Sequence, residues 1–266
     1  MSVRTRIVGA TAQRWTLTRR LLPKRHVAYP VRGGRVYLSL GNAPASLQRV
    51  LRTYEPNKFR NIERFLPRGG GFVDVGANAG DFGVWAARCG GPDTRVLAVE
   101  AEPENARWLQ RTVDLNRLSS QVSVVQVAAS DRDGETELIL TDWNGTHSIV
   151  ENQLHHEIEM FRPRGRVTVA TRKLDDLIGE SPLPRVDLVK IDVEGAELVV
   201  LRGATELLSR SGALTLLIDL HFGVDLDELV NLLHSHGFSI GSEENPDVLI
   251  QSVPDGTLSI VATRPG

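Results

Sequence analysis

Four small or polar residues at alternate positions follow a short hydrophobic segment: Asp74, Gly76, Asn78 and Gly80. Glycines at such a turn let the backbone approach a ligand closely, and a helix that follows offers free N–H groups to it. A carboxylate, Glu100, ends the next hydrophobic segment. In this position it can accept hydrogen bonds from both hydroxyls of a ribose. The pattern predicts a site for a nucleoside-containing ligand, with tight packing of the turn as the alternative.

Two classes of nucleoside cofactor fit such a turn, and the residue types separate them. A nicotinamide dinucleotide requires G-x-G-x-x-G, whose glycines surround a pyrophosphate. Counted from Gly76, the second glycine position holds Asn78 and the third holds Asp81, whose carboxylate would repel a pyrophosphate. S-adenosylmethionine has no phosphate and carries a positive sulfonium, which carboxylates such as Asp81 and Glu100 attract. The turn therefore favours S-adenosylmethionine over a nicotinamide cofactor.

A second group of ionisable residues lies at the ends of two later hydrophobic segments. Lys190, Asp192 and Glu194 alternate at the end of one, so they can project from the same side of a strand. His221 directly follows the other segment. If the two strands are neighbours, His221 lies beside Asp192, and both carboxylates point towards the place of the sulfonium methyl group. Glu197, in the first turn of the next helix, favours the helix dipole.

This group can assist methyl transfer in three ways, which the sequence leaves open. Transfer to an alcohol requires aligned reactants and removal of the hydroxyl proton, and an imidazole titrates near neutral pH. His221 would then be the base, with Asp192 and Glu194 beside it. The three side chains could instead ligate a divalent metal such as Mg²⁺ that binds the hydroxyl. In the third interpretation, His221 only forms hydrogen bonds with the two carboxylates.

Short hydrophobic segments alternate with amphipathic ones in the part of the chain that carries these residues. Strands are predicted at 71–75, 95–100, 122–128, 186–192 and 214–220, and helices at 81–88, 102–118, 195–209 and 225–236. Such alternation is typical of a doubly wound parallel sheet, covered by helices on both faces. Two last strands, at 248–252 and 257–262, flank a Pro-Asp-Gly turn and are predicted to be antiparallel.

The segment between the third and fourth predicted strands interrupts that alternation. Turn residues and strand-like runs predict a β-rich insertion at about 131–174. Long insertions in compact domains are usually functional. Trp143, Asn144 and His147 lie in it, and such side chains suit recognition of a sugar or another polar acceptor. Tyr54, which precedes the first strand, is a further candidate for substrate binding.

Composition and charge bound the remaining possibilities. The 266 residues are 41% hydrophobic and 24% charged, which is typical of a globular protein. There is no apolar run long enough for a transmembrane segment, and a single cysteine excludes an internal disulfide. Eleven of the 31 Lys and Arg residues precede the first acidic residue, Glu55. We expect a basic N-terminal extension (1–45), either solvated or facing an anionic partner, and one cytoplasmic domain (46–266).

Five segments, in this order, resemble the FkbM family of S-adenosylmethionine-dependent methyltransferases: FVDVGANAGDFG, LAVEAEPEN, TRKLDDL, VDLVKIDVEGAELVVLRGA and LLIDLH. The resemblance covers about residues 65–221. It implies a Rossmann-like class I methyltransferase fold, with a mostly parallel seven-stranded sheet and an antiparallel last strand. It also implies cofactor contacts from Asp74, Gly76, Ala77, Asn78 and Gly80 at the methionine part, Glu100 at the ribose, Ser130 at the adenine, and Asp192 near the sulfonium.

The resulting prediction is an S-adenosylmethionine-dependent O-methyltransferase that acts on a hydroxyl of a small molecule, in secondary metabolism or glycan modification. The insertion and the basic extension favour a sugar-containing or anionic acceptor. An N-methyltransferase of a small molecule and a non-catalytic S-adenosylmethionine-binding module are the alternatives. No nucleic-acid partner is expected, because the fourth strand lacks an Asn/Asp-Pro-Pro-aromatic motif and Asp192 and Glu194 would repel phosphates. The oligomeric state is open, a homodimer included.

Overall fold

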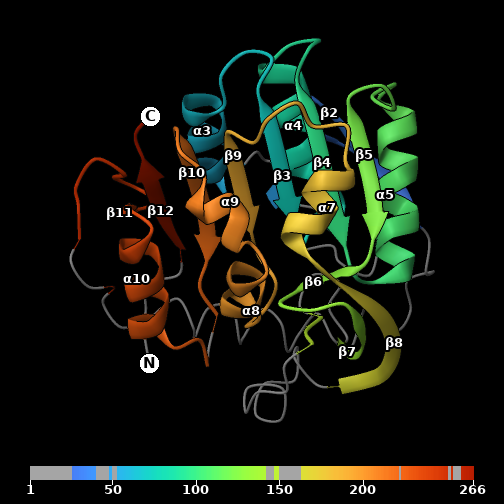
Figure 1. Ribbon diagram of the computed structural model, residues 1–266. Helices are drawn as coiled ribbons and strands as arrows, with labels where there is room; N and C mark the ends of the chain where they lie inside the picture. The colour runs from blue at the N-terminus through green and yellow to red at the C-terminus, as the bar shows by residue number, and fades with distance from the viewer. Residues whose placement is uncertain are drawn as a thin grey trace.

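The computed structural model describes residues 26–39, 48–49, 53–141, 147–149, 163–221, 223–250, 253 and 259–266. Its main element is a seven-stranded sheet (Figure 1). In order across the sheet, the strands are β11 (Ser239–Ser242), β12 (Ser259–Arg264), β10 (Leu214–Asp219), β9 (Leu188–Ile191), β3 (Gly71–Val75), β4 (Arg95–Glu100) and β5 (Val122–Gln126). The strands from β10 to β5 are parallel, and β12 is antiparallel to both of its neighbours. The predicted mostly parallel, doubly wound sheet with an antiparallel last strand is confirmed.

Helices cover both faces of this sheet (Figure 1). One face packs against α3 (Pro56–Phe65), α4 (Asp81–Cys89) and α5 (Pro103–Leu115), and the other against α7 (Leu174–Glu180), α8 (Glu197–Arg202), α9 (Thr205–Ser209) and α10 (Leu226–Ser235). In β3, Phe72 faces the first group, whereas Val73 and Val75 face the second. Because the central strands are buried on both faces, they are runs of apolar residues. Among the described residues, the helices are too short or too polar to cross a membrane.

A second sheet of three strands lies beside the edge where the parallel strands end (Figure 1). It consists of β6 (Ala128–Ser130), β8 (Pro163–Lys173) and β7 (Gly134–Thr141). Ile139 of β7 also pairs with Ser148, so residues 147–149 lie against this sheet. The described part of the predicted insertion is therefore β-structure, and it is placed next to the candidate site.

The described part of the basic extension is a hairpin that packs on α5. Its strands are β1 (His26–Val31) and β2 (Gly34–Ser39). The Asn116 side chain, just after α5, accepts the Arg35 N–H at 2.9 Å and donates to the Arg35 carbonyl at 2.6 Å. Val36 of the hairpin packs against Ala79 of the glycine turn. This hairpin therefore belongs to the folded body and supports the turn of the candidate site.

The structure differs from the sequence prediction at the C-terminal end of the sheet. The sixth strand of the large sheet is β11, rather than a strand over 248–252. Leu249 makes only an isolated bridge with Gly241, and residues 251–252 lie outside the described ones. Val248 and Leu249 are 64% and 62% exposed. Val248 and Leu249, in the segment predicted as a buried strand, therefore face outward, whereas Ile250 is partly buried against the core.

Two elements predicted as continuous are divided in the structure. The helix predicted over 195–209 is split into α8 and α9 around Gly203. A Cβ on Gly203 would lie 1.8 Å from the Ser130 carbonyl oxygen, so this close approach requires glycine. The strand predicted over 122–128 divides into β5 and β6, which belong to different sheets. Both divisions arise where the small sheet meets the large one.

Candidate active site

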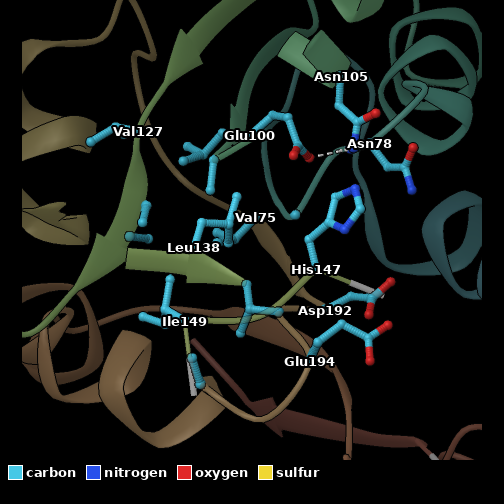
Figure 2. A pocket seen from close by; sticks show the side chains of 17 residues that line it. Val75, Asn78, Glu100, Asn105, Val127, Leu138, His147, Ile149, Asp192 and Glu194 are labelled. Atoms are coloured by element: carbon cyan, nitrogen blue, oxygen red, sulfur yellow. Dashed lines mark hydrogen bonds between the residues drawn. The ribbon is translucent and has the colours of Figure 1, made fainter. Parts of the chain in front are cut away.

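A cavity of about 620 Å³ opens at the carboxyl ends of the parallel strands. Its walls come from the ends of β3, β4 and β9, from the start of α5 and from the small sheet (Figure 2). Glu100 lies at one end of this space and Asp192 and Glu194 at the other. The topology thus brings together two groups of acidic residues that are far apart in the sequence, as the parallel sheet predicts.

Glu100 is held in place by the backbone of the glycine turn. One carboxylate oxygen accepts the N–H of Asn78 at 2.8 Å, and the other accepts the N–H of Glu102 at 2.9 Å. Burial raises the pKa of Glu100 to about 7, although these two N–H donors lower it. Each oxygen has a second lone pair for a further donor, and the carboxylate lines the cavity. This is the arrangement that a ribose diol requires.

Gly76 lets the glycine turn (76–80) lie directly against the loop after β9, which carries Asp192 and Glu194. Its φ of +75° lies in the left-handed region. A Cβ there would lie 1.9 Å from the carbonyl oxygen of Asp192, so a larger residue would push β3 and β9 apart. Asn78 also has a positive φ, +47°, which Asn tolerates better than most residues. The sequence pattern therefore reflects a real backbone requirement at this turn.

The middle of the cavity is apolar. Its wall includes Val127, Ala128, Ala129, Leu138 and Ile149. These small and branched side chains, which come mostly from the small sheet, form a surface that suits a flat heterocycle such as adenine. Ser130, the predicted adenine contact, does not line this cavity, and its hydroxyl lies 3.4 Å from an Asp131 carboxylate oxygen.

His147 is the insertion residue whose imidazole reaches the cavity. Figure 2 shows its ring in the space between Asn78 and Asp192. Its Nδ1 accepts the Thr141 N–H at 3.1 Å, so the remaining proton is on Nε2. Burial lowers the pKa of His147 to about 4. At neutral pH this side chain is therefore an uncharged hydrogen-bond donor to a ligand. The other predicted insertion contacts, Trp143 and Asn144, lie outside the described residues.

A buried lysine, Lys190, pairs with carboxylates from β3 and from the end of β9. Lys190 Nζ lies 3.2 Å from Asp74 and 3.4 Å from Asp192, and it donates to the Gly76 carbonyl at 2.8 Å. Asp74 is completely buried and does not line the cavity. Asp74 is therefore not exposed to a ligand in this cavity. Its ion pair with Lys190 positions the start of the glycine turn instead. Ala77 and Gly80 also lie outside the cavity wall.

Asp192, Glu194 and His221 form one cluster, as predicted for neighbouring strands. His221 Nε2 lies 3.4 Å from a Glu194 oxygen and 3.7 Å from an Asp192 oxygen. The three side chains offer ligand atoms that all lie within 4.8 Å of one another. The arrangement can therefore hold a proton between imidazole and carboxylates, or one divalent cation.

Glu197 has a role that the sequence analysis missed. Its carboxylate is fully buried, and one oxygen lies 2.7 Å from His221 Nδ1 and accepts the Gly195 N–H at 3.1 Å. This contact directs Nε2 of His221 towards Asp192 and Glu194. An acidic residue in a first helical turn is common, so the only sequence signal is that apolar core residues follow it directly.

Burial and neighbouring charges shift the pKa values of His221, Glu194 and Asp192, and so determine which of these side chains are protonated. Burial lowers the pKa of His221, but the hydrogen bond with Glu197 and the nearby carboxylates outweigh it and raise the pKa to about 10. Burial raises the pKa of Glu194 to about 8, although His221 lowers it. For Asp192, burial is outweighed by Lys190, and the pKa is lowered. At neutral pH Asp192 is therefore an anion, whereas His221 and Glu194 each hold a proton.

Tyr54, the remaining predicted substrate contact, lies outside this cavity. It stacks on Phe82 with ring centroids 6.2 Å apart, and the Arg49 guanidinium lies 3.7 Å above its ring. It lines a second, smaller cavity instead.

Comparison of the sequence with known proteins identifies a family and several relatives. The family described as Methyltransferase FkbM domain matches residues 74–240. Methyltransferase sdnD of Sordaria araneosa is 32% identical over 163 residues, 53% of this chain and 62% of that protein. The 2-O-methyltransferase NoeI of Sinorhizobium fredii is 30% identical over 129 residues, 45% of this chain and 51% of that protein. The Hexuronic acid methyltransferase AglP of Haloferax volcanii is 28% identical over 162 residues, 60% of this chain and 59% of that protein.

These alignments span 51–62% of the length of the three relatives. The resemblance predicted from the sequence motifs is confirmed by the family match. Because that match covers more than half of the chain and includes both ends of the cavity, this chain belongs to the FkbM methyltransferase family.

Proposed function

We propose that this chain is an S-adenosylmethionine-dependent O-methyltransferase that acts on a hydroxyl of a small, sugar-containing acceptor. The observation that carries the proposal is the continuity of one cavity, with the Glu100 carboxylate at one end and Asp192 and Glu194, which contact His221, at the other. Such a cavity holds a nucleoside and exposes its reactive end to a base. A dinucleotide would place a pyrophosphate near the anionic Asp192, which would repel it.

The residues of the cavity fit the parts of S-adenosylmethionine. Glu100 accepts hydrogen bonds from the ribose hydroxyls, and the apolar wall around Ala128 and Leu138 packs on the adenine. Asp192, which stays anionic, attracts positive charge at the far end. When bound, the cofactor supplies an electrophilic methyl group on a sulfonium. The neutral Nε2–H of His147 donates to an oxygen of cofactor or acceptor.

An oxygen acceptor is favoured over a nitrogen acceptor because the cluster contains a positioned base. His221 Nε2 removes the proton of the acceptor hydroxyl, while Glu197 holds the proton on Nδ1. Neighbouring positive charge at the acidic end lowers the pKa of His221, so ligand binding prepares it to accept a proton. The names of NoeI, a 2-O-methyltransferase, and AglP, a hexuronic acid methyltransferase, support a sugar hydroxyl or a sugar acid as acceptor.

The same three side chains fit a divalent cation. Two carboxylates and an imidazole with ligand atoms within 4.8 Å form a common donor set for such ions. A bound Mg²⁺ would supply a Lewis acid that holds the acceptor oxygen and lowers the pKa of its hydroxyl. Asp192, Glu194 and His221 would then be ligands, and Glu197 would orient the imidazole.

Thermal unfolding with added ligands tests the proposed cofactor. S-adenosylhomocysteine at about 100 times its Kd should raise Tm by roughly 5–10 °C, and NAD should leave Tm unchanged. The Glu100→Gln variant should lose most of this shift, because an amide replaces one of the two acceptor oxygens. Glu104→Gln, at an exposed position on α5, is the matched control. A wild-type protein that gains no stability from S-adenosylhomocysteine would contradict the proposal.

The pH dependence of activity tests the role of Glu197. Turnover requires unprotonated His221, so kcat/KM should rise with pH towards the pKa of about 10 in the free protein. In Glu197→Gln the negative charge beside Nδ1 is lost, so the pKa falls and the rising part of the profile moves to lower pH. Glu206→Gln, on the surface of α9, should leave the profile in place. An unchanged profile in Glu197→Gln would show that Glu197 does not act through His221.

A further inference from the structure

A second, smaller cavity, partly open to solvent, lies between the β1–β2 hairpin and the starts of α3 and α4. Its wall contains two arginines, Arg32 and Arg49, together with Asp81 and the aromatic rings of Tyr54 and Phe59. The site described above uses none of these residues for binding or proton transfer. Two guanidinium groups and one carboxylate leave this small space with a net positive charge.

Arg49 has hydrogen-bond donors that none of the described residues uses. The residue is only 7% exposed, and its Nε donates to both Asp81 oxygens, at 3.0 and 2.9 Å. Its plane lies over the Tyr54 ring, with Cζ 3.7 Å from the centroid. Among the residues that the structure describes, the Nη1 and Nη2 groups have no hydrogen-bonding partner. Arg49 lines the cavity, and its Nη donors are available for an acceptor bound there.

Arg32 adds a second cation to the cavity wall. Its guanidinium lies 5.5 Å from the Phe59 ring and 5.2 Å from the Trp85 ring. In the described ranges it forms no ion pair with an acidic side chain. Guanidinium groups bind planar carboxylates through paired N–H donors, and stacking on aromatic rings fixes their orientation. Since Phe59 also borders the cavity, its wall suits a carboxylate attached to an apolar or ring-shaped body.

The second cavity lies close to the reaction site. Tyr54, on its wall, stacks on Phe82, and the Phe82 ring lies 5.4 Å from Nζ of Lys190. Lys190 in turn donates to the Gly76 carbonyl in the wall of the first cavity. Asp81 directly follows the glycine turn. Tyr54 and Phe82 therefore link the second cavity to Lys190 and the glycine turn at the wall of the first cavity.

We propose that the cavity between Arg32, Arg49 and Tyr54 is a carboxylate-binding subsite, with the free N–H groups of Arg49 making the contact. This proposal rests on the proposed function. The carboxylate can come from the amino-acid end of the cofactor or from an acidic acceptor, such as a uronic acid. Both sources present the same group to Arg49, and binding measurements separate them.

Binding of four probes to two variants provides the test. Arg49→Lys keeps a cation beside Asp81 but removes the guanidinium donors, and Arg32→Gln removes a charge that has no acidic partner within the described residues. Calorimetry would compare S-adenosylhomocysteine with 5′-methylthioadenosine, which lacks the amino-acid end. With S-adenosylhomocysteine bound, it would then compare glucuronate with glucose. Arg202→Lys, in a surface ion pair with Glu228, is the control.

The outcomes distinguish the two sources and the two proposals. If the carboxylate belongs to the cofactor, Arg49→Lys weakens S-adenosylhomocysteine by about tenfold or more and leaves 5′-methylthioadenosine unchanged. If it belongs to the acceptor, the variant keeps its affinity for S-adenosylhomocysteine and loses the preference for glucuronate over glucose. Affinities within twofold of wild type for all four probes in both variants overturn the subsite. Wild-type protein that binds no S-adenosylhomocysteine overturns the proposed function instead.

Discussion

Replacement of His221 by Ala should lower methyl transfer by about 100-fold or more, because general-base catalysis contributes on that order. Affinity for S-adenosylhomocysteine should stay within a few fold of wild type, since His221 does not line the cofactor cavity. Transfer of a labelled methyl group to an acceptor found by screening sugars and uronic acids measures the first effect. Calorimetry with S-adenosylhomocysteine measures the second.

The control for this variant is His234→Ala, which removes an exposed imidazole from α10. If His221→Ala retains turnover within about threefold of wild type, His221 is neither base nor metal ligand. Removal of metal ions by a chelator distinguishes a role of His221 as a base from a role as a metal ligand. Treatment of the wild-type protein with EDTA leaves the rate unchanged if His221 acts as a base alone. The rate is lost, and Mg²⁺ restores it, if the cluster holds a metal.

Replacement of Lys190 by Met should lower the free energy of unfolding by about 3–5 kcal/mol, because one partner of a buried ion pair would remain without compensation. Asp74 is completely buried, and within the described residues Lys190 is the cation that pairs with it. Burial already raises the pKa of Asp74. Without Lys190 this pKa rises further, so Asp74 becomes protonated more easily. The loss of stability should therefore grow as pH rises, and urea unfolding at several pH values measures it.

The double variant Asp74→Asn with Lys190→Met is the control for that experiment. It removes both charges, and replacement of a whole buried pair is often close to neutral. Most of the stability lost in the single variant should return. If Lys190→Met alone lowers the free energy of unfolding by less than about 1 kcal/mol, protonation of Asp74 compensates for the lost cation. The ion pair would then not be what holds the glycine turn.

Most of the fold could be predicted from the sequence because its determinants are local. A parallel strand buried on both faces needs a continuous apolar run, and each crossover needs an amphipathic helix. These patterns predicted the positions of β3, β4, β9 and β10. One exception is the segment at 248–252, where Val248 and Leu249 are exposed instead of buried. Composition cannot tell which face of such a segment another element covers.

The sequence by itself determined that Glu100, Asp192, Glu194 and His221 meet at one edge, because parallel strands all end there. Only the tertiary structure decided what these residues touch. It placed Asp74 under the glycine turn with Lys190 and paired Glu197 with His221. These contacts join residues from different elements, and their geometry depends on how several helices and two sheets pack together. The spacing of residues along the chain does not encode that packing, so the pairs Asp74–Lys190 and Glu197–His221 are visible only in the tertiary structure.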